Sequence, residues 1–392
     1  MSRADLERIW RAGVEACLPA RVLPQHLPEA PRGRTIALAL GKAAPGMAEA
    51  LEAAWGGVLS GLAVAPHGTR ASLRHMEFAT AAHPVPDAAS VEAAERLLAL
   101  AASAGPDDLV LVLLSGGASS LACLPGEGLA LPEKQALTAA LLRSGAAIGE
   151  INCVRRHLSR IKGGRLGRAA MPARLVTLAI SDVAGDRLED IGSGPTVAAA
   201  GTAADARAVL ARFGIDPPAA GWSETVKSVR GEYRIVASNA AAVAAAAAEA
   251  ERRGYRPVLL GDAAGEARDA GRAHAEHALR TNGRCALISG GELSVAVRGS
   301  GRGGRNQEYA LAAAAVLAGS RVSGLSADTD GIDGNSRAAG AFFDGASATA
   351  REAAEALASN DSGAFLARKG DLFVTGATGT NVSDLRILLT PP

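Results

Sequence analysis

Glycine-rich and acidic segments follow several short apolar runs of this chain, and their residue types could bind phosphate or move a proton. Glycine accounts for 46 of the 392 residues, about 12% against the roughly 7% usual in proteins. The first such segment, Gly41-Lys42, follows the run 35–40. A lysine at the carboxyl end of a strand can reach a phosphate, although most lysines are simply solvated. The pattern G-x-x-x-x-G-K-[ST] is absent, so Lys42 is not part of a Walker A loop.

A second segment, Ser115-Gly116-Gly117-Ala118-Ser119-Ser120, directly follows the run 109–114. Adjacent glycines expose backbone N–H groups, and such a turn before a helix binds anions through those donors and the helix dipole. The alternative is a tight turn with a serine as helix N-cap. We favour an anion-binding loop, because the ligand loops of α/β proteins follow buried strands.

Two carboxylates, Asp182 and Asp186, stand four residues apart after the run 175–180. They could hold Mg²⁺ through water or accept a proton from a substrate hydroxyl, or they could only stabilise the turn. A later acidic turn, Asp328 to Gly334, begins like a calcium loop. It has Ile332 and Ala339 where that loop needs carboxylates, so a calcium loop is excluded. This turn is still suited to Mg²⁺ or to substrate hydroxyls.

The segment 299–304 matches the dinucleotide pattern G-x-G-x-x-G, and Asp328 follows it at about the spacing that a dinucleotide site requires. Glycine-dense loops also produce this pattern by chance. Arg302 and Arg305 add positive charge, and phosphoryl-transfer sites need such charges. We therefore interpret the segment as a flexible cationic loop that faces a polyanion, with the dinucleotide site as the alternative.

Other familiar catalytic arrangements are missing from the sequence. The hydrolase pattern G-x-S-x-G is absent. His274 and His277 share a helical face but lack a third metal ligand nearby, so a solvated surface is the better interpretation. The lack of a distinct nucleophile suits phosphoryl transfer, in which the protein mainly positions groups and neutralises charge.

Short apolar strands that alternate with helices must position these segments. The expected strands are 35–40, 58–65, 109–114, 175–180, 256–260, 285–289 and 372–375, and the expected helices include 91–102, 132–143 and 239–253. Alternation of this kind predicts an α/β fold with mainly parallel sheets covered on both faces. The segment 213–223 has little apolar periodicity, so it is a linker or a long surface loop.

Composition bounds the class of protein. The net charge of +1 and the 3% aromatic residues disfavour a role in binding nucleic acid or a membrane surface. Cys17, Cys123, Cys153 and Cys285 form no C-x-x-C pair and are expected to be reduced and buried. No apolar run approaches a membrane span and the first residues do not form a signal peptide, so we expect a cytoplasmic protein of two domains.

Taken in order, the loops resemble the class II glycerate kinases, also called the glycerate 2-kinase or MOFRL family. The matching segments span nearly the whole chain, and their joint order is more specific than any one of them. They are Leu40-Gly41-Lys42-Ala43-Ala44, His83-Pro84-Val85-Pro86-Asp87, Leu114 to Ser120, Asn152 to Gly164, Ser181 to Asp186, Gly192 to Thr196, Gly303 to Glu308, Asp328 to Gly331 and Thr378 to Val382.

The resemblance implies a Rossmann-like N-terminal domain with a parallel sheet (residues 1–230), a smaller α/β MOFRL-type domain (residues 231–392) and an active site in the cleft between them. It implies phosphorylation of D-glycerate at the 2-hydroxyl to 2-phosphoglycerate, with ATP and Mg²⁺ or another divalent cation. The expected partners are this substrate and the nucleotide, with no nucleic acid and no membrane. The oligomeric state is not readable from the sequence, although a homodimer is one option.

The resemblance also assigns roles to matching positions. Lys42 and Arg305 would neutralise the transferring phosphoryl group, and Asp182 or Asp186 would orient the hydroxyl or hold Mg²⁺. The expected cofactor-binding residues at these positions are Ser115, Gly116, Gly117, Ser119, Lys162, Glu308, Asp328 and Asn381. Gly290 and Gly291 are added from the turn Ser289-Gly290-Gly291-Glu292, which closes another expected strand and resembles the first Ser-Gly-Gly turn but carries a carboxylate. Members of this family have also been named hydroxypyruvate reductases, so an NAD(P)H-dependent reductase is the main alternative, and a non-catalytic sensor is a second.

Overall fold

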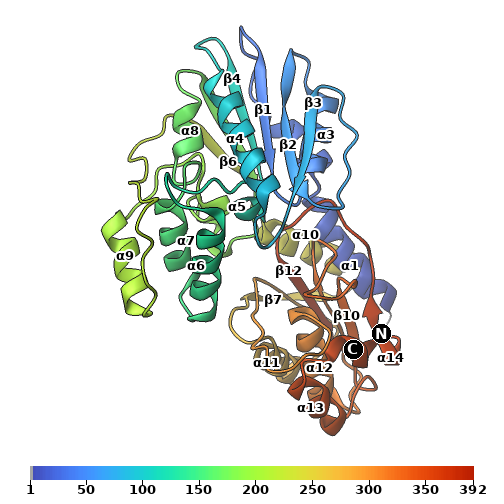
Figure 1. Ribbon diagram of the computed structural model, residues 1–392. Coiled ribbons are helices and arrows are strands. Elements are labelled where there is room, and N and C mark those ends of the chain that lie inside the picture. The colour runs from blue at the N-terminus through green and yellow to red at the C-terminus, as the bar shows by residue number, and fades with distance from the viewer. Residues whose placement is uncertain (1–2) are drawn as a thin grey trace. The chain divides into compact units, whose positions relative to one another are not determined.

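The computed structural model describes residues 3–392, and the chain divides into two compact units (Figure 1). The central unit comprises Val22–Val236, and the terminal unit combines Met1–Arg21 with Ala237–Pro392. The expected limits, 1–230 and 231–392, stay a prediction about domains. The compact units differ from those limits in grouping the first helix with the C-terminal half of the chain.

The central unit is built on a six-stranded sheet in the order β3-β2-β1-β4-β5-β6, in which β3, β2, β1, β4 and β5 pair in parallel. Its strands are β1 (Thr35–Leu40), β2 (Leu59–Pro66), β3 (Met76–Ala81), β4 (Leu109–Leu114), β5 (Arg174–Ile180) and β6 (Glu232–Ala237). Every residue of β1 and β4 is buried. This is why both strands appear in the sequence as unbroken apolar runs.

Helices cover this sheet and form a satellite cluster beside it. They are η1 (Pro24–His26), α3 (Ala44–Ala54), α4 (Ala88–Ala102), α5 (Ala118–Leu121), α6 (Leu131–Arg143), α7 (Ile148–His157), α8 (Arg165–Ala169), η2 (Ala184–Asp186), η3 (Ile191–Ser193) and α9 (Ala203–Arg212). The short helix α2 (Pro19–Val22) spans the limit between the two units in the sequence. Leu97 of α4 shares a core with Leu38 and Val112 of the sheet. Helices α6, α7 and α9 bury a separate cluster that includes Leu141, Val154 and Leu210.

The terminal unit contains a second six-stranded sheet in the order β11-β10-β9-β12-β8-β7. Its strands are β7 (Arg256–Asp262), β8 (Cys285–Gly290), β9 (Ser323–Asp328), β10 (Gly340–Asp344), β11 (Leu372–Phe373) and β12 (Asp384–Leu389). Only the β7–β8 pair is parallel, so the expectation of mainly parallel sheets is wrong here. The physical reason is that no helix separates β9 from β10, and two strands joined without a crossover pair in antiparallel fashion.

Helices lie on both faces of this second sheet. They are α1 (Arg3–Ala16), α10 (Asn239–Arg252), α11 (Ala267–Arg280), α12 (Arg305–Leu317), α13 (Ala350–Ala358) and α14 (Ser362–Lys369). Residues of α1 and α10 share a core with Ile288 and Ile387, whereas residues of α11 and α12 share one with Leu287 and Leu388. Successive strand residues point to opposite faces, so the two cores belong to a three-layered arrangement.

The strands expected at 35–40 and 109–114 are confirmed to the residue, and those at 58–65, 175–180, 256–260 and 285–289 are confirmed within two residues at each end. The strand expected at 372–375 is shorter, and β3, β6, β9, β10 and β12 were not expected. Residues 213–223 form a long loop inside the central unit.

Cys17, Cys123 and Cys285 are buried, Cys153 is half-buried, and all four are unpaired. Among residues 3–392, no helix is long and apolar enough to cross a membrane.

Gly13 allows α1 to lie close against the rest of the terminal unit. A Cβ atom at this position would stand 2.7 Å from Leu385 Cδ2 and 2.9 Å from the carbonyl oxygen of Ala242. We expect Gly13→Leu to lower the free energy of unfolding by about 1–3 kcal/mol, because a larger side chain overpacks this contact. Urea unfolding would measure the loss. Arg8→Leu places the same side chain at an exposed position of the same helix, and equal stability of the two variants would contradict the packing argument.

Candidate active site

The loops that follow β1, β4 and β5 lie at one edge of the central sheet, because these three strands are adjacent and parallel. The first two loops are joined directly. The N–H of Lys42 donates to the carbonyl of Gly116 at 2.8 Å, and the N–H of Ala43 donates to Ser115 Oγ at 3.1 Å. The fold therefore brings Lys42 and the Ser115–Ser119 segment together, as their places at neighbouring strand ends imply.

Gly117 adopts the left-handed conformation, with φ of +84°, and two polar side chains lie over it. A Cβ atom on Gly117 would stand 2.9 Å from His83 Cδ2 and 3.4 Å from Lys42 Cγ. Any side chain here would displace these residues as well as strain the turn. His83 was not among the predicted site residues. The signal that could have found it is its position two residues after β3, a strand that the sequence analysis missed.

The predicted anion loop has a more limited set of donors than expected. The following helix, α5, has only four residues, so its dipole contributes little to anion binding. Ser115 is buried, and its hydroxyl is already engaged with the N–H of Ala43 and the carbonyl of Leu40. Contact of Ser115, Gly116, Gly117 or Ser119 with a ligand stays a prediction, and it would depend mainly on backbone N–H groups.

Lys162 lies behind this loop and is only 2% exposed. Its ammonium group donates to the carbonyl oxygens of Ser119 at 2.6 Å and Ala122 at 3.0 Å. Burial lowers the pKa of Lys162 to about 7. These contacts give Lys162 a role in holding the end of α5, and its contact with a nucleotide stays a prediction.

A polar network runs from the loop into α7 and the turn before η3. Ser119 Oγ lies 3.1 Å from Ser193 Oγ, and Ser193 Oγ donates to Asn152 Oδ1 at 3.2 Å. Asn152 Nδ2 donates in turn to Asp190 Oδ1 at 3.0 Å, and Arg156 pairs with the same carboxylate at 3.3 Å. Ser193 has a positive φ of +62°, which the network holds in place. The sequence analysis predicted a role for Ser119 only. It predicted none for the other four residues of the network, which are Asn152, Arg156, Asp190 and Ser193.

Asp182 and Asp186 are both half-buried in the loop after β5. Asp186 has a φ of +52°, a conformation that aspartate tolerates better than most residues. No group of three or more His, Cys, Asp or Glu side chains surrounds a common metal position in the part of the chain that the structure describes. A cation here would therefore need further ligands from water or a substrate, and the metal role of the two aspartates stays a prediction.

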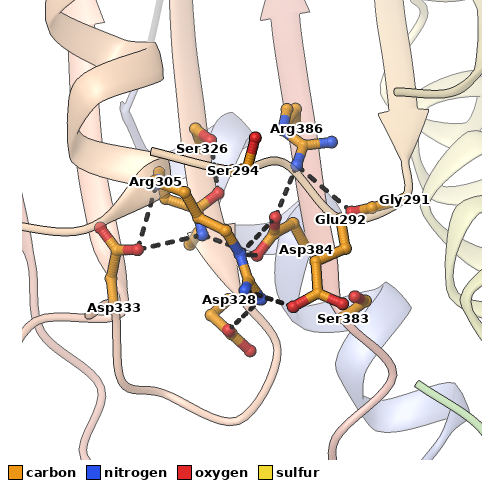
Figure 2. A network of polar contacts seen from close by, with 12 residues as sticks. Gly291, Glu292, Ser294, Arg305, Ser326, Asp328, Asp333, Ser383, Asp384 and Arg386 are labelled. Carbon is orange, nitrogen blue, oxygen red and sulfur yellow. Dashed lines mark hydrogen bonds and ion pairs between the residues drawn. The ribbon is translucent and has the colours of Figure 1, made fainter. Parts of the chain in front are cut away.

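Arg305, the first residue of α12, is surrounded by three carboxylates of the terminal unit (Figure 2). Its Nε donates to both oxygens of Asp384 at 2.8 and 2.9 Å, while its two terminal nitrogens reach Glu292 at 2.6 Å and Asp328 at 2.8 Å. Burial lowers the pKa of Arg305, but the three carboxylates outweigh it and raise the pKa above its ordinary value. The cation is permanent, and its charge is compensated within the protein.

Asp384 connects Arg305 to a second arginine that the sequence analysis did not single out. Arg386 is fully buried and donates to Asp384 Oδ2 at 2.6 Å, to the carbonyl of Gly290 at 2.6 Å and to that of Gly291 at 3.2 Å (Figure 2). The predicted residues Gly290, Gly291, Arg305 and Asp328 are thus brought together through Asp384 and Arg386. Both lie on β12, which was not expected as a strand.

The N-terminus of α12 already binds a carboxylate of the protein itself. Asp333 is buried and accepts from the N–H groups of Asn306 at 3.1 Å and Gln307 at 2.9 Å. Burial raises the pKa of Asp333 to about 7, although these two donors oppose the shift. A dinucleotide pyrophosphate would need the same N–H groups. No strand ends directly before the glycine segment 299–304 either, since residues 291–304 hold only an isolated bridge at Ser294, so the dinucleotide pattern lacks its structural context.

The glycine segment is fastened rather than flexible, which corrects the expectation. Asn360 Oδ1 accepts from the N–H groups of Arg298 at 2.7 Å and Gly299 at 2.9 Å, and the N–H of Gly301 donates to Ser359 at 3.1 Å. Hydrogen bonds to the backbone N–H groups of a loop limit the local unfolding of that loop. The loop expected to be flexible and to face a polyanion is thus tied by hydrogen bonds to the segment 359–360 of the terminal unit.

Two further predicted residues lie outside the Arg305 cluster. Glu308 is 2% exposed and accepts from Asn360 Nδ2 at 2.6 Å and from Arg268 at 2.9 Å. Asn381 is also buried, and its side-chain oxygen accepts from the N–H of Ser383 at 3.3 Å. Their contact with a cofactor stays a prediction, since both side chains are used within the terminal unit.

Lys162 should make stability depend on pH above neutrality. Its pKa in the folded protein is about 7, below the roughly 10.4 of an unfolded lysine, so the unfolded chain binds more protons between these values. The free energy of unfolding should therefore rise with pH from about 7 to about 10, and Lys162→Met should reduce that rise. Urea unfolding across this range is the measurement. Lys227→Met, at an exposed position, is the control, and an unchanged slope in Lys162→Met would refute the assignment.

Replacement of Arg386 should destabilise the protein, because its partner Asp384 is a buried carboxylate. We expect Arg386→Met to lower the free energy of unfolding by about 3–5 kcal/mol, because Asp384 loses a buried cation. The double variant Asp384→Asn/Arg386→Met should lose less than the two single losses combined, since neither of the two residues leaves the other's charge buried without its partner. Chemical denaturation of the four proteins measures this coupling. Additive losses would mean that the pair is not energetically linked.

Comparisons with known proteins cover both units. Residues 5–226 match the model of a domain of unknown function, DUF4147, and residues 285–384 match the MOFRL family. The D-glycerate 2-kinase of Thermotoga maritima is 40% identical over 97% of this chain and 96% of its own. Human glycerate kinase is 34% identical over all of this chain and 94% of its own. A protein of Agrobacterium vitis with a provisional hydroxypyruvate reductase name is 45% identical over 99% of this chain and 94% of its own.

A solved structure agrees with these relationships. The crystal structure of glycerate kinase from Thermotoga maritima, 40% identical, matches with a TM-score of 0.88 and covers 98% of each chain. These proteins match this chain over nearly its whole length, and the fold is shared with the solved structure. The chain therefore belongs to the glycerate 2-kinase family, and its own sequence has a DUF4147 match followed by a MOFRL match.

Proposed function

We propose that this protein transfers the γ-phosphoryl group of ATP to the 2-hydroxyl of D-glycerate, giving 2-phosphoglycerate and ADP. The observation that carries the proposal is the 40% identity to a D-glycerate 2-kinase over 97% of the chain. In this reaction the glycerate oxygen forms a bond to phosphorus, the bond from phosphorus to the ADP oxygen breaks, and the hydroxyl proton passes to a base.

Lys42 and the adjoining loop are the proposed phosphoryl-binding groups of the central unit. Lys42 lies at the end of β1, is tied through its backbone to Gly116 and has its side chain beside Gly117. A lysine held in this way supplies a positive charge where negative charge develops in the transition state. Lys162 supports the loop from behind by fixing the carbonyl groups of Ser119 and Ala122.

Asp182 and Asp186 are the proposed partners of the glycerate hydroxyl and of Mg²⁺. Mg²⁺ bound with a nucleotide usually takes one or two carboxylates and completes its shell with phosphate oxygens and water. Two half-buried aspartates in one loop suit that arrangement. The cation would neutralise phosphate charge, while one aspartate would accept the hydroxyl proton.

Arg305 is the proposed cation of the terminal unit that contacts phosphate. Glu292, one of its three partners, has a side chain that is 55% exposed, so it can turn into solvent at little cost. Asp384 is fully buried and keeps Arg305 in place. Phosphate could thus replace Glu292 while the guanidinium group stays oriented.

The reductase alternative is supported by the provisional names of relatives such as the one from Agrobacterium vitis. It is disfavoured by the start of α12, where Asp333 takes two of the N–H groups that a pyrophosphate would use. A non-catalytic sensor would not need an oriented lysine and arginine. Cytoplasmic location and the absence of nucleic-acid or membrane partners remain predictions from the sequence, and a homodimer stays one option for the oligomeric state.

The decisive assay combines purified protein, D-glycerate, ATP and Mg²⁺, with the product resolved as 2- or 3-phosphoglycerate by phosphorus NMR. We expect 2-phosphoglycerate, and we expect Lys42→Ala to lower kcat by about 10²–10³-fold, as loss of one transition-state donor does. Removal of the divalent cation with EDTA should abolish turnover.

Lys227→Ala, which removes an exposed lysine, is the matched control and should retain wild-type activity. A parallel reaction contains hydroxypyruvate and NADH. Oxidation of NADH without phosphoryl transfer would overturn the kinase proposal in favour of the reductase. Absence of both reactions, with nucleotide still bound, would favour a sensor.

A further inference from the structure

The terminal unit contains a cavity of about 370 Å³ beside the glycine segment, and the proposed function uses only Arg305 of its lining residues. Ligand pockets for small molecules range from about 300 to 1,000 Å³. The cavity is far larger than a three-carbon hydroxy acid needs, because each non-hydrogen atom of an organic molecule fills only about 20 Å³ at the packing density of protein interiors. Its volume instead suits a molecule the size of a nucleoside.

One wall of the cavity is apolar. Leu293, Val295 and Val297 line it at a spacing of two residues. The side chain of Val297 is 77% exposed. An apolar wall with an exposed valine gains free energy from contact with an apolar or aromatic face, at about 25 cal/mol per Å² buried.

A second wall consists of backbone alone. Gly299, Gly301 and Gly303 line the cavity, and no larger residue fits at these positions. A Cβ atom would stand 2.2 Å from Ser359 O at Gly299, 2.6 Å from Asn360 O at Gly301 and 2.5 Å from Ser362 Oγ at Gly303. The hydrogen bonds from Asn360 hold this wall in place before any ligand binds. It offers a preformed surface without side chains, on which a planar ring can lie.

The polar side chains of the cavity are almost all engaged with the protein itself. Asn360 contacts the backbone of the glycine segment and Glu308, and the charge of Glu308 is balanced by Arg268 at 2.9 Å. Asn335 Oδ1 accepts from the N–H of Gly303 at 2.9 Å. Arg305 also lines the cavity, and its exposed partner Glu292 can turn away. The cavity thus joins a largely neutral, apolar region to one strong cation.

From this geometry we propose that the cavity binds the nucleoside part of ATP, with the base between the valine wall and the glycine backbone and the phosphates directed to Arg305. The proposal rests on the proposed kinase function, which requires an ATP site, and adds which surface recognises the base. D-glycerate is a poor occupant, since a small anion covered with oxygens gains little from an apolar wall. An aromatic base buries both of its faces there and leaves its phosphates beside a guanidinium group.

The test uses equilibrium binding of AMP and ATP to the full-length protein by calorimetry, together with steady-state KM values for ATP and D-glycerate. Val295→Trp fills the cavity, and Val297→Ser removes apolar contact from an exposed position with little risk to folding. We expect Val295→Trp to raise Kd for AMP and KM for ATP at least tenfold, and Val297→Ser to raise both about three- to fivefold. The KM for D-glycerate should change less than twofold.

Leu259→Trp introduces the same bulky side chain at an exposed position of β7 that does not line the cavity, and it should bind AMP as the wild type does. Wild-type affinity for AMP in both cavity variants would overturn the proposal, as would failure of the wild type to bind AMP at millimolar concentration. If the wild type phosphorylates D-glycerate and the cavity variants are unaffected, only the base-binding proposal fails. If no glycerate is phosphorylated, the kinase proposal fails while the AMP titrations still decide the role of the cavity.

Discussion

A single buried carboxylate, Asp384, determines how the charged groups of the terminal unit are arranged. It is inaccessible to solvent and binds Arg305, Arg386 and the side chain of Asn306, at 2.7 Å for the last. A buried anion is tolerated only with such partners, because the loss of hydration costs several kcal/mol. Asp384 in turn fixes three separate parts of the unit: the start of α12, the end of β8 and β12 itself. Together with Asp328 and Glu292, this charge sets the orientation of Arg305.

The central unit also contains a buried charged group that is held by polar partners, but these partners are of a different kind. There the buried ion is Lys162, and its partners are backbone carbonyl groups at the end of a four-residue helix. Carbonyl dipoles compensate a cation less completely than a carboxylate does, which agrees with the lowered pKa of the lysine. The terminal unit thus orients a fully charged arginine through ion pairs. The central unit holds a glycine turn through a buried lysine whose pKa is lowered to about 7.

A strand could be predicted from the sequence only where its burial shows in its composition as a run of apolar residues. Strands β1 and β4 are unbroken apolar runs, so their limits and the loops after them were predictable. Strand β12 reads Asp-Leu-Arg-Ile-Leu-Leu, and only tertiary partners explain why its aspartate and arginine can be buried. Strands β9 and β10 carry glycine, serine and aspartate for the same reason. His83 and Asp333 were missed because their roles depend on neighbours that are distant in sequence.

Helix α1 gives the chain an order of assembly as well as a shape. Its apolar stripe, with Leu6, Ile9 and Trp10, packs against residues of β9 and β12, which lie far later in the sequence. At ordinary rates of translation, on the order of 5–20 residues per second, the helix waits tens of seconds for its partners. The central unit has all of its own residues well before then. Until those strands have been synthesised, the apolar stripe of α1 has no native strand to cover it.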